Sequence, residues 1–286
     1  MDLPGEYDRP REWHIETRQM AVQPFFFGTG AELLFGCYHA PGPATHRTSA
    51  VVLCYPMGEE YIRFHRAWRY LAARLAEAGF PALRFDYYGC GNSAGDFEHG
   101  SIDRWRADVS AAIGQVRRRC GVSRVCLIGL RLGATLSMVV AAERADVNGL
   151  VLWDPVVSGP AHVAELAAAH KEMLAKALVM PERPTRGPLP TEVLGFPLTH
   201  SLVTDLEQID LLAVQRRPAN NVLIISSHKQ DTQRPLEQHL RRLGARVAYQ
   251  RSPIPDVWEW NEDVGRVILP SEIVQATVAW MSAVYP

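Results

Sequence analysis

The residues with the clearest chemical implication surround an arginine that lies between two glycines. Residues 125–134 read as an apolar strand, a tight turn and the start of a helix, with Gly129 and Gly133 on either side of Arg131. Glycines at this spacing let a strand and a helix approach closely, because no Cβ atom separates the two backbones. Such turns can present a serine nucleophile. A guanidinium stays protonated and cannot attack a carbonyl carbon, so this turn lacks a nucleophile.

Arg131 itself has two interpretations. It is expected at the N-terminus of a helix, where the helix dipole disfavours a cation, so a nearby acid should compensate its charge. As a functional residue it would clamp a carboxylate or phosphate of a substrate. Otherwise it forms an internal salt bridge that fills a disused pocket. The acids expected at the same edge of the sheet are Asp154, Asp231, Glu259 and Glu262.

Two further places could supply catalytic groups. His228 and Asp231 follow an expected strand and could act together as a general base, although a solvated loop histidine fits the same pattern. Cys90 lies in a glycine-rich turn and could be a relocated nucleophile if a base or a cation lay nearby. The alternative for Cys90 is a turn residue with a purely structural role.

Candidate substrate-binding residues follow the ends of expected strands or lie in an acidic and aromatic stretch at 256–263. That stretch could line a pocket, and a surface loop anchored by its two tryptophans is equally consistent with it. The candidates are Tyr55, Met57, Asp154, Trp258 and Glu259.

Strands that alternate with helices predict an α/β fold with a mainly parallel central sheet and helices on both faces. We expect a first hairpin from strands 22–28 and 32–39. The later strands are expected at 50–54, 80–85, 123–128, 148–153, 221–227 and 245–250. The helices are expected at 61–78, 102–119, 132–144, 161–178, 233–243 and 272–284.

The domain organisation follows from a change of composition after the strand at 148–153. Residues 1–20 are polar and predict an N-terminal arm. Residues 21–156 and 216–286 form the expected core, and 157–215 read as an insertion that could serve as a lid over the carboxyl edge of the sheet. A proline-rich run at 181–190 within the insertion is typical of a stiff linker, or of an extended segment that recruits a partner.

Composition excludes several classes of partner. A net charge of −1 gives no electrostatic attraction for nucleic acid or anionic membrane. No apolar run reaches the roughly 18 residues that a transmembrane helix needs. The five cysteines are scattered, which suits reduced thiols, and the first residues lack the features of a secretory signal. We therefore expect a cytoplasmic protein that acts on a small molecule without a cofactor or metal, with a homodimer as an open alternative.

The turn GCGNSAG at 89–95, the turn GLRLG at 129–133 and the order of elements resemble the α/β-hydrolase superfamily, in its serine aminopeptidase-like S33 group. More narrowly, residues 86–97 and 129–134 are similar to hydrolase-like proteins associated with bacterial exosortase systems. The superfamily resemblance covers roughly residues 22–284 and implies an α/β-hydrolase fold.

The resemblance also assigns roles to particular residues. It places the family's nucleophile at Arg131, its acid at Asp231 and its oxyanion loop at 55–58. The family's histidine belongs to the loop after the last strand, here 252–264, and this loop holds no histidine. A Ser-His-Asp mechanism needs the base beside the nucleophile, so the resemblance implies a degenerate triad.

Two functional hypotheses remain open from the sequence. In the first, an enzyme acts on an acyl, ester or thioester-like small molecule, anionic or linked to an acyl carrier. It would be a hydrolase or acyltransferase with a mechanism that uses no serine in the turn, and Arg131 would bind an anionic group. In the second, a catalytically inactive homologue, or pseudoenzyme, serves as a binding or scaffold protein.

Overall fold

The computed structural model describes residues 22–42, 47–176, 191–228, 230–254 and 270–286. The arm predicted at 1–20, the proline-rich run at 181–190, and Trp258, Glu259 and Glu262 lie outside these residues.

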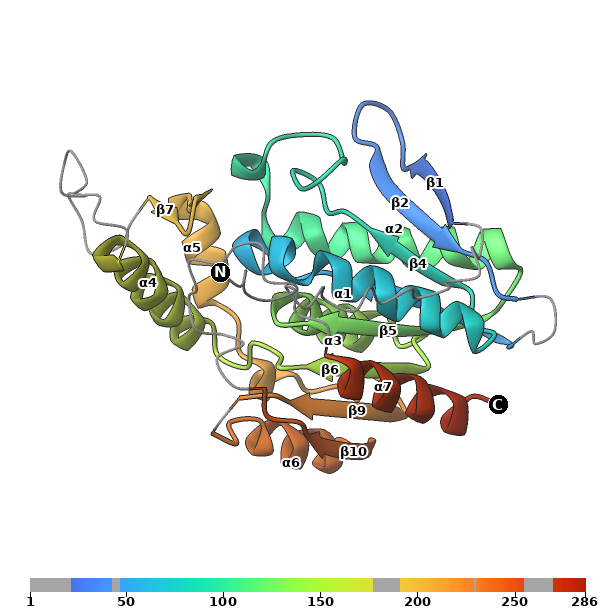
Figure 1. Ribbon diagram of the computed structural model, residues 1–286. Helices are drawn as coiled ribbons and strands as arrows, with labels where there is room; N and C mark the ends of the chain where they lie inside the picture. Colours follow the sequence, from blue (N-terminus) through green and yellow to red (C-terminus); the bar gives the residue numbers. More distant parts are fainter. Residues whose placement is uncertain (1–21, 43–46, 177–190, 229, 255–269) are drawn as a thin grey trace, which may run out of the picture.

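A central eight-stranded sheet forms the framework, in the order β1-β2-β4-β3-β5-β6-β9-β10 (Figure 1). The strand β1 pairs antiparallel with β2, and β2 with β4, while the remaining neighbours pair in parallel. This confirms the α/β-hydrolase fold class. The strands are β1 (Val22–Phe27), β2 (Leu34–His39), β3 (Ser49–Cys54), β4 (Ala82–Phe85), β5 (Arg124–Leu130), β6 (Gly149–Trp153), β9 (Asn221–Ser226) and β10 (Arg246–Arg251).

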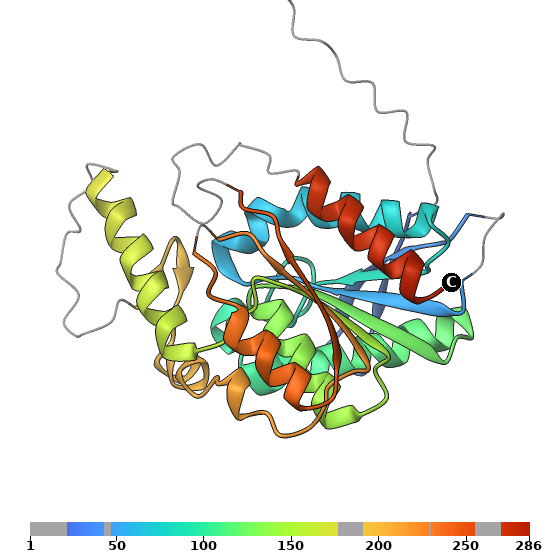
Figure 2. The ribbon, with the colours of Figure 1, turned by 90° about the horizontal axis from the view of Figure 1, so that it is seen from below.

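Helices cover both faces of this sheet (Figure 2). The helices α1 and α7 lie on one face, and α2, α3 and α6 lie on the other. Every residue of β3 and β6 is buried, as expected for parallel strands that are covered on both sides. The helices are α1 (Gly58–Glu77), α2 (Ile102–Cys120), α3 (Leu132–Arg144), α6 (Arg234–Arg242) and α7 (Ser271–Val284).

The helix α1 begins earlier than predicted, and the difference matters for the site. The periodicity of Trp68, Leu71 and Leu75 placed the start near residue 61, and these three side chains are indeed buried. The helix starts at Gly58, so Glu59 and Glu60 belong to its first turn and not to a loop. Acids in a first turn interact favourably with the helix dipole.

The chain between β6 and β9 adds small elements beside the core. The helix α4 (Gly159–Lys176) packs against α5 (His200–Glu207), and a short antiparallel pair, β7 (Glu192–Val193) and β8 (Phe196–Pro197), lies between them in sequence. Figure 1 shows α4, α5 and β7 grouped at one end of the molecule. The role of this insertion as a lid stays a prediction.

Candidate functional site

The turn between β5 and α3 has the close approach that its glycines suggested. A Cβ atom on Gly129 would stand 2.4 Å from Cα of Ala134, and one on Gly133 would stand 2.3 Å from the carbonyl oxygen of Tyr55. Arg131 occupies the apex with φ 52° and ψ −120°, a conformation that side-chain-bearing residues rarely adopt. Surrounding structure must hold such a residue, at a cost of roughly 1–3 kcal/mol.

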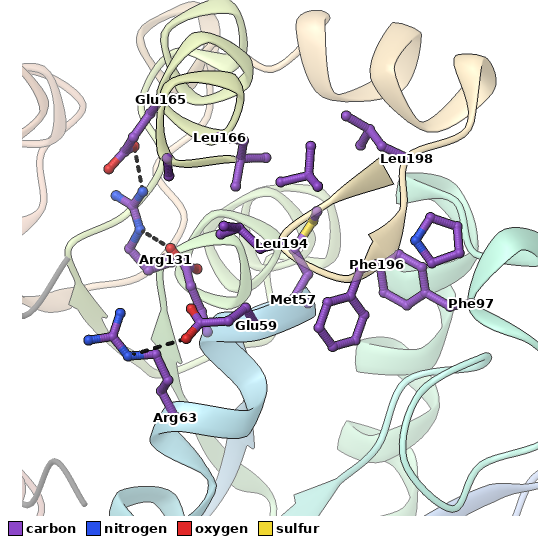
Figure 3. Close-up of a pocket in the computed structure, with 15 residues that line it drawn as sticks. Met57, Glu59, Arg63, Phe97, Arg131, Glu165, Leu166, Leu194, Phe196 and Leu198 are labelled. Carbon is purple, nitrogen blue, oxygen red and sulfur yellow. Dashed lines mark hydrogen bonds and ion pairs between the residues drawn. The ribbon is translucent and has the colours of Figure 1, made fainter. Parts of the chain in front are cut away.

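The guanidinium of Arg131 is buried and surrounded by partners from three parts of the chain. Its Nε donates to Oε1 of Glu60 at 2.9 Å, and its Nη2 donates to Oε2 of Glu165 at 2.5 Å (Figure 3). Nδ1 of His162 lies 3.3 Å from Nη2, and Nε2 of His228 lies 3.4 Å from Nη1. All three nitrogens of the side chain therefore face protein groups.

Local structure explains why these groups meet. Glu60 lies in the first turn of α1, close to the N-terminus of that helix. His162 and Glu165 are three residues apart on α4, so they share one face of it, with Nδ1 of His162 3.5 Å from Oε2 of Glu165. The helix α4 thus brings a carboxylate and an imidazole to the turn after β5.

The ion pairs shift the ionisation of the cluster. Burial alone would raise the pKa of Glu165, but hydrogen bonding from His162 and the charge of Arg131 lower this pKa to about 2. Burial alone would lower the pKa of Arg131, and Glu60 and Glu165 together raise that pKa above its usual value. Both partners are therefore ionised across the physiological range, and Arg131 is an internally paired cation.

Two of the four acids expected to pair with Arg131, Asp154 and Asp231, bond to other residues, while Glu259 and Glu262 lie outside the described residues. Asp154 is fully buried, and its carboxylate accepts hydrogen bonds from the backbone N–H of Ser227 at 2.9 Å and from the hydroxyl of the same residue. Asp231 accepts a hydrogen bond from the hydroxyl of Tyr249 and one from Arg234, 3.0 Å away. Asp154 follows β6, the direct neighbour of β5, so a place at the end of an adjacent strand does not by itself bring an acid to the guanidinium.

The other predicted site residues fall in different environments. Burial raises the pKa of Cys90 to about 12, which is the opposite of what an activated thiol requires. The hydroxyl of Tyr55 accepts a hydrogen bond from Arg84 at 2.6 Å inside the core, away from the pocket described below. Met57 lines that pocket. His228 contacts Arg131, while Asp231 bonds elsewhere, so the proposed His228–Asp231 pair is not formed.

A pocket opens beside Arg131, with about 640 Å³ of empty space when the solvent at its mouth is included. Figure 3 shows Arg131 and Glu165 on one side of it and Phe97 and Phe196 on the other. The 3₁₀ turn Phe97–His99 supplies Phe97, whose ring centroid lies 5.6 Å from that of Phe196. The apolar side chains in the lining are Met57, Phe97, Leu166, Ala169, Val193, Leu194, Phe196, Pro197 and Leu198.

The remaining lining is charged. Glu59 and Arg63, one helical turn apart on α1, lie 3.4 Å from each other at the pocket. Together with Glu60, Arg131 and Glu165 they give the lining three carboxylates and two guanidinium groups. The arrangement suits a ligand with an apolar body and one polar end. Within the described ranges no group of histidines, cysteines and acids could hold a metal ion, and no helix there is long and apolar enough to cross a membrane.

Sequence reasoning missed Glu60, Glu165 and His162. Glu60 was hidden because the start of α1 was placed too late. The spacing of His162 and Glu165 could have been used, because a histidine and an acid three residues apart on a helix lie on the same face of it. The sequence could not show that this face of α4 turns toward Arg131.

Comparison with known proteins identifies the family to which the chain belongs. Residues 45–225, more than half of the chain, match the family described as serine aminopeptidase, S33. The chain therefore belongs to this family of α/β-hydrolases. A thermostable monoacylglycerol lipase from Bacillus sp. (strain H-257) is 30% identical over 96 residues, which cover 34% of this chain and 38% of the lipase.

Solved structures of esterases share the fold. Est1E from Butyrivibrio proteoclasticus, with ferulic acid bound, superimposes with a TM-score of 0.63 and 16% identity over 90% of this chain and 97% of the esterase. The esterase Pf2001 of Pyrococcus furiosus gives a TM-score of 0.62 and 16% identity over 93% of this chain and 91% of its own. At this level of identity the likeness establishes the fold alone.

Proposed function

We propose that this chain binds an acyl- or ester-bearing small molecule in the pocket beside Arg131 and does not cleave it through a nucleophile in the turn after β5. The observation that carries the proposal is the pairing of Arg131 with Glu60 and Glu165 at one end of a largely apolar pocket. A guanidinium cannot act as a nucleophile, and here its hydrogen-bond donors are already engaged.

Two further features support an acyl or ester ligand. Apolar side chains dominate the pocket, and burying an alkyl chain there gains roughly 0.8 kcal/mol for each methylene group. The curated relative that matches a third of the chain is a monoacylglycerol lipase, whose name refers to an acyl ester. A pocket of this type can bind an acyl chain in a protein that lacks the catalytic nucleophile, because binding does not require that residue.

Catalysis by another route receives less support. In that alternative Arg131 holds an anionic group while His228, Asp231 or Cys90 acts on an acyl, ester or thioester substrate, as in a hydrolase or acyltransferase. The carboxylate of Asp231 is engaged by Tyr249 and Arg234, and burial raises the pKa of Cys90. The closer resemblance to exosortase-associated proteins, an acyl-carrier-linked substrate, a homodimer and a cytoplasmic location stay predictions.

Calorimetric titration with methyl decanoate tests the proposal. The wild-type protein should bind the ester saturably, and Phe196→Ala should weaken binding about tenfold through lost apolar contact. Phe26→Ala is the matched control, because Phe26 lies on β1 with 58% of its surface exposed and does not line the pocket. Absence of saturable binding, or equal affinity for Phe196→Ala and the wild type, would overturn the proposal.

A further inference from the structure

Resting on this proposed function, we propose that the ligand is a carboxylic acid with an apolar chain, and that its carboxylate replaces Glu165 on the guanidinium of Arg131. In this arrangement Glu165 is an internal occupant of the ligand's own anion site. The apolar lining does not specify the polar end of the ligand, whereas the guanidinium of Arg131 does.

The two carboxylates on Arg131 differ in how easily each can leave. The side chain of Glu60 is 13% exposed and belongs to the core helix α1. The side chain of Glu165 is 42% exposed and belongs to α4, in the insertion. A half-exposed carboxylate that leaves its partner enters water directly, where it is well solvated. A Glu60 carboxylate separated from Arg131 would itself remain a largely buried charge without that partner, which is far more costly. Exchange is therefore expected at Glu165.

The position held by Oε2 of Glu165 suits any carboxylate oxygen. It lies 2.5 Å from Nη2 of Arg131 and 3.5 Å from Nδ1 of His162, and His162 is itself buried. An incoming carboxylate at this place would accept a charge-assisted hydrogen bond from Arg131 and, with Nδ1 protonated, face a second donor on His162. A neutral alcohol or ester could not compensate the guanidinium in the same way.

The charge balance favours exchange over addition. With Glu165 in place, the pocket lining carries one more carboxylate than guanidinium. A further anion beside Arg131 would meet two carboxylates on the same guanidinium and be repelled by both. If the ligand takes the place of Glu165, the number of negative charges on Arg131 stays the same. Ligand binding and the Arg131–Glu165 ion pair are thus mutually exclusive.

The neighbouring residues connect this anion site to the apolar pocket. Leu166 follows Glu165 directly on α4 and lines the pocket, as do Leu194 and Phe196. Figure 3 shows Leu166 and Leu194 between the Arg131 end and Phe196. A carboxylate on Arg131 can therefore continue into an alkyl chain that runs along these side chains.

The test compares decanoate with decanol, which share one alkyl chain length and differ in the charged group. Calorimetric titrations at neutral pH use the wild type, Glu165→Gln and Glu172→Gln. Removing the internal competitor should raise the affinity for decanoate about tenfold in Glu165→Gln and leave the affinity for decanol unchanged. Glu172→Gln should leave both affinities as in the wild type, because Glu172 lies on the same helix but bonds to Lys176 and does not line the pocket.

The outcomes separate this inference from the proposed function. If decanol binds saturably and Glu165→Gln does not favour decanoate, the inference is wrong and the proposed function stands. If neither compound binds to any of the three proteins, both are wrong. Should Glu165→Gln not fold, carbon NMR of the Glu165 carboxyl in the wild type gives the answer. At neutral pH, saturating decanoate should move this carboxyl resonance toward that of a solvated glutamate while decanol should not, and a resonance that decanoate leaves in place overturns the exchange.

Discussion

Nη2 of Arg131 lies 2.5 Å from Oε2 of Glu165, and this contact joins the turn after β5 to helix α4 of the insertion. The position that related hydrolases use for attack on a carbonyl here ties two parts of the fold together. The partner on the core side, Glu60, completes the pairing. Under the proposed function, ligand binding therefore depends on how this internally paired cation responds to the ligand.

Arg131→Ser should not create an esterase. A general base must lie about 2.6–3.2 Å from the hydroxyl that it activates. His162 and His228 contact the terminal nitrogens of Arg131, so each is separated by most of the arginine side chain from the place of a serine hydroxyl. We expect no hydrolysis of p-nitrophenyl butyrate and no labelling by a fluorophosphonate. A label on residue 131 would show that a base does reach this position.

Glu60→Gln should lower the free energy of unfolding by about 2–4 kcal/mol, because it removes a charged acceptor from a buried guanidinium. Urea unfolding at neutral pH measures this change, with the slope against urea as a check on the two-state behaviour.

Glu59→Gln is the matched control for Glu60→Gln. Both residues lie in the first turn of α1, so both substitutions lose the same favourable interaction with the helix dipole. Glu59 is 18% exposed and pairs with Arg63 at 3.4 Å, a longer contact than the 2.9 Å between Glu60 and Arg131, so its loss should cost less. Equal losses for the two variants would mean that the pairing of Glu60 with Arg131 adds nothing to stability.

The stability of the wild type should depend on pH through Glu165. The pKa of this carboxyl is about 2 in the folded protein against 4.5 for the free group, so its stabilising contribution is complete above pH 4.5. That contribution is lost as the pH falls from 4.5 toward 2. Glu165→Gln should show a shallower loss of unfolding free energy in this window, and Glu172→Gln should follow the wild type. Parallel curves for Glu165→Gln and the wild type would contradict the assigned pairing.

Gly133→Ala should be strongly destabilising, by about 3 kcal/mol or more, because the new Cβ would stand 2.3 Å from a backbone oxygen that cannot move aside. Gly114→Ala, in α2, meets only the end of the Arg118 side chain at 3.3 Å. It should stabilise the protein by about 0.5–1 kcal/mol. Thermal unfolding compares the two, and a tolerated Gly133→Ala would mean that the turn lacks the close approach described.

Much of the fold followed from the sequence. Buried parallel strands such as β3 are continuous apolar runs, and the periodicity of Trp68, Leu71 and Leu75 marked α1 as a helix against the sheet. Gly129 and Gly133 located the turn around Arg131, since only glycine fits there. These signals are local, so a single sequence carries them.

The partners of Arg131 could not be obtained in the same way. Glu165 reaches it from α4, whose orientation depends on packing against α5 and not on its own sequence. Glu60 was misplaced by the late start of α1, because helix boundaries are poorly defined by periodicity. The interpretation of Arg131 as one half of an internal salt bridge was considered from the sequence, but the acids named for it were Asp154, Asp231, Glu259 and Glu262. In the described residues the acids are Glu60 and Glu165.

The most direct test of the account is recovery of an ester after prolonged incubation with a stoichiometric amount of the wild-type protein. Methyl decanoate is bound to saturation and then extracted and quantified by chromatography together with any decanoate. The ester should be recovered intact, with no more decanoate than in a protein-free control. Release of decanoate at a rate proportional to protein concentration would contradict the account, and loss of that release in Arg131→Ala would assign the reaction to this site.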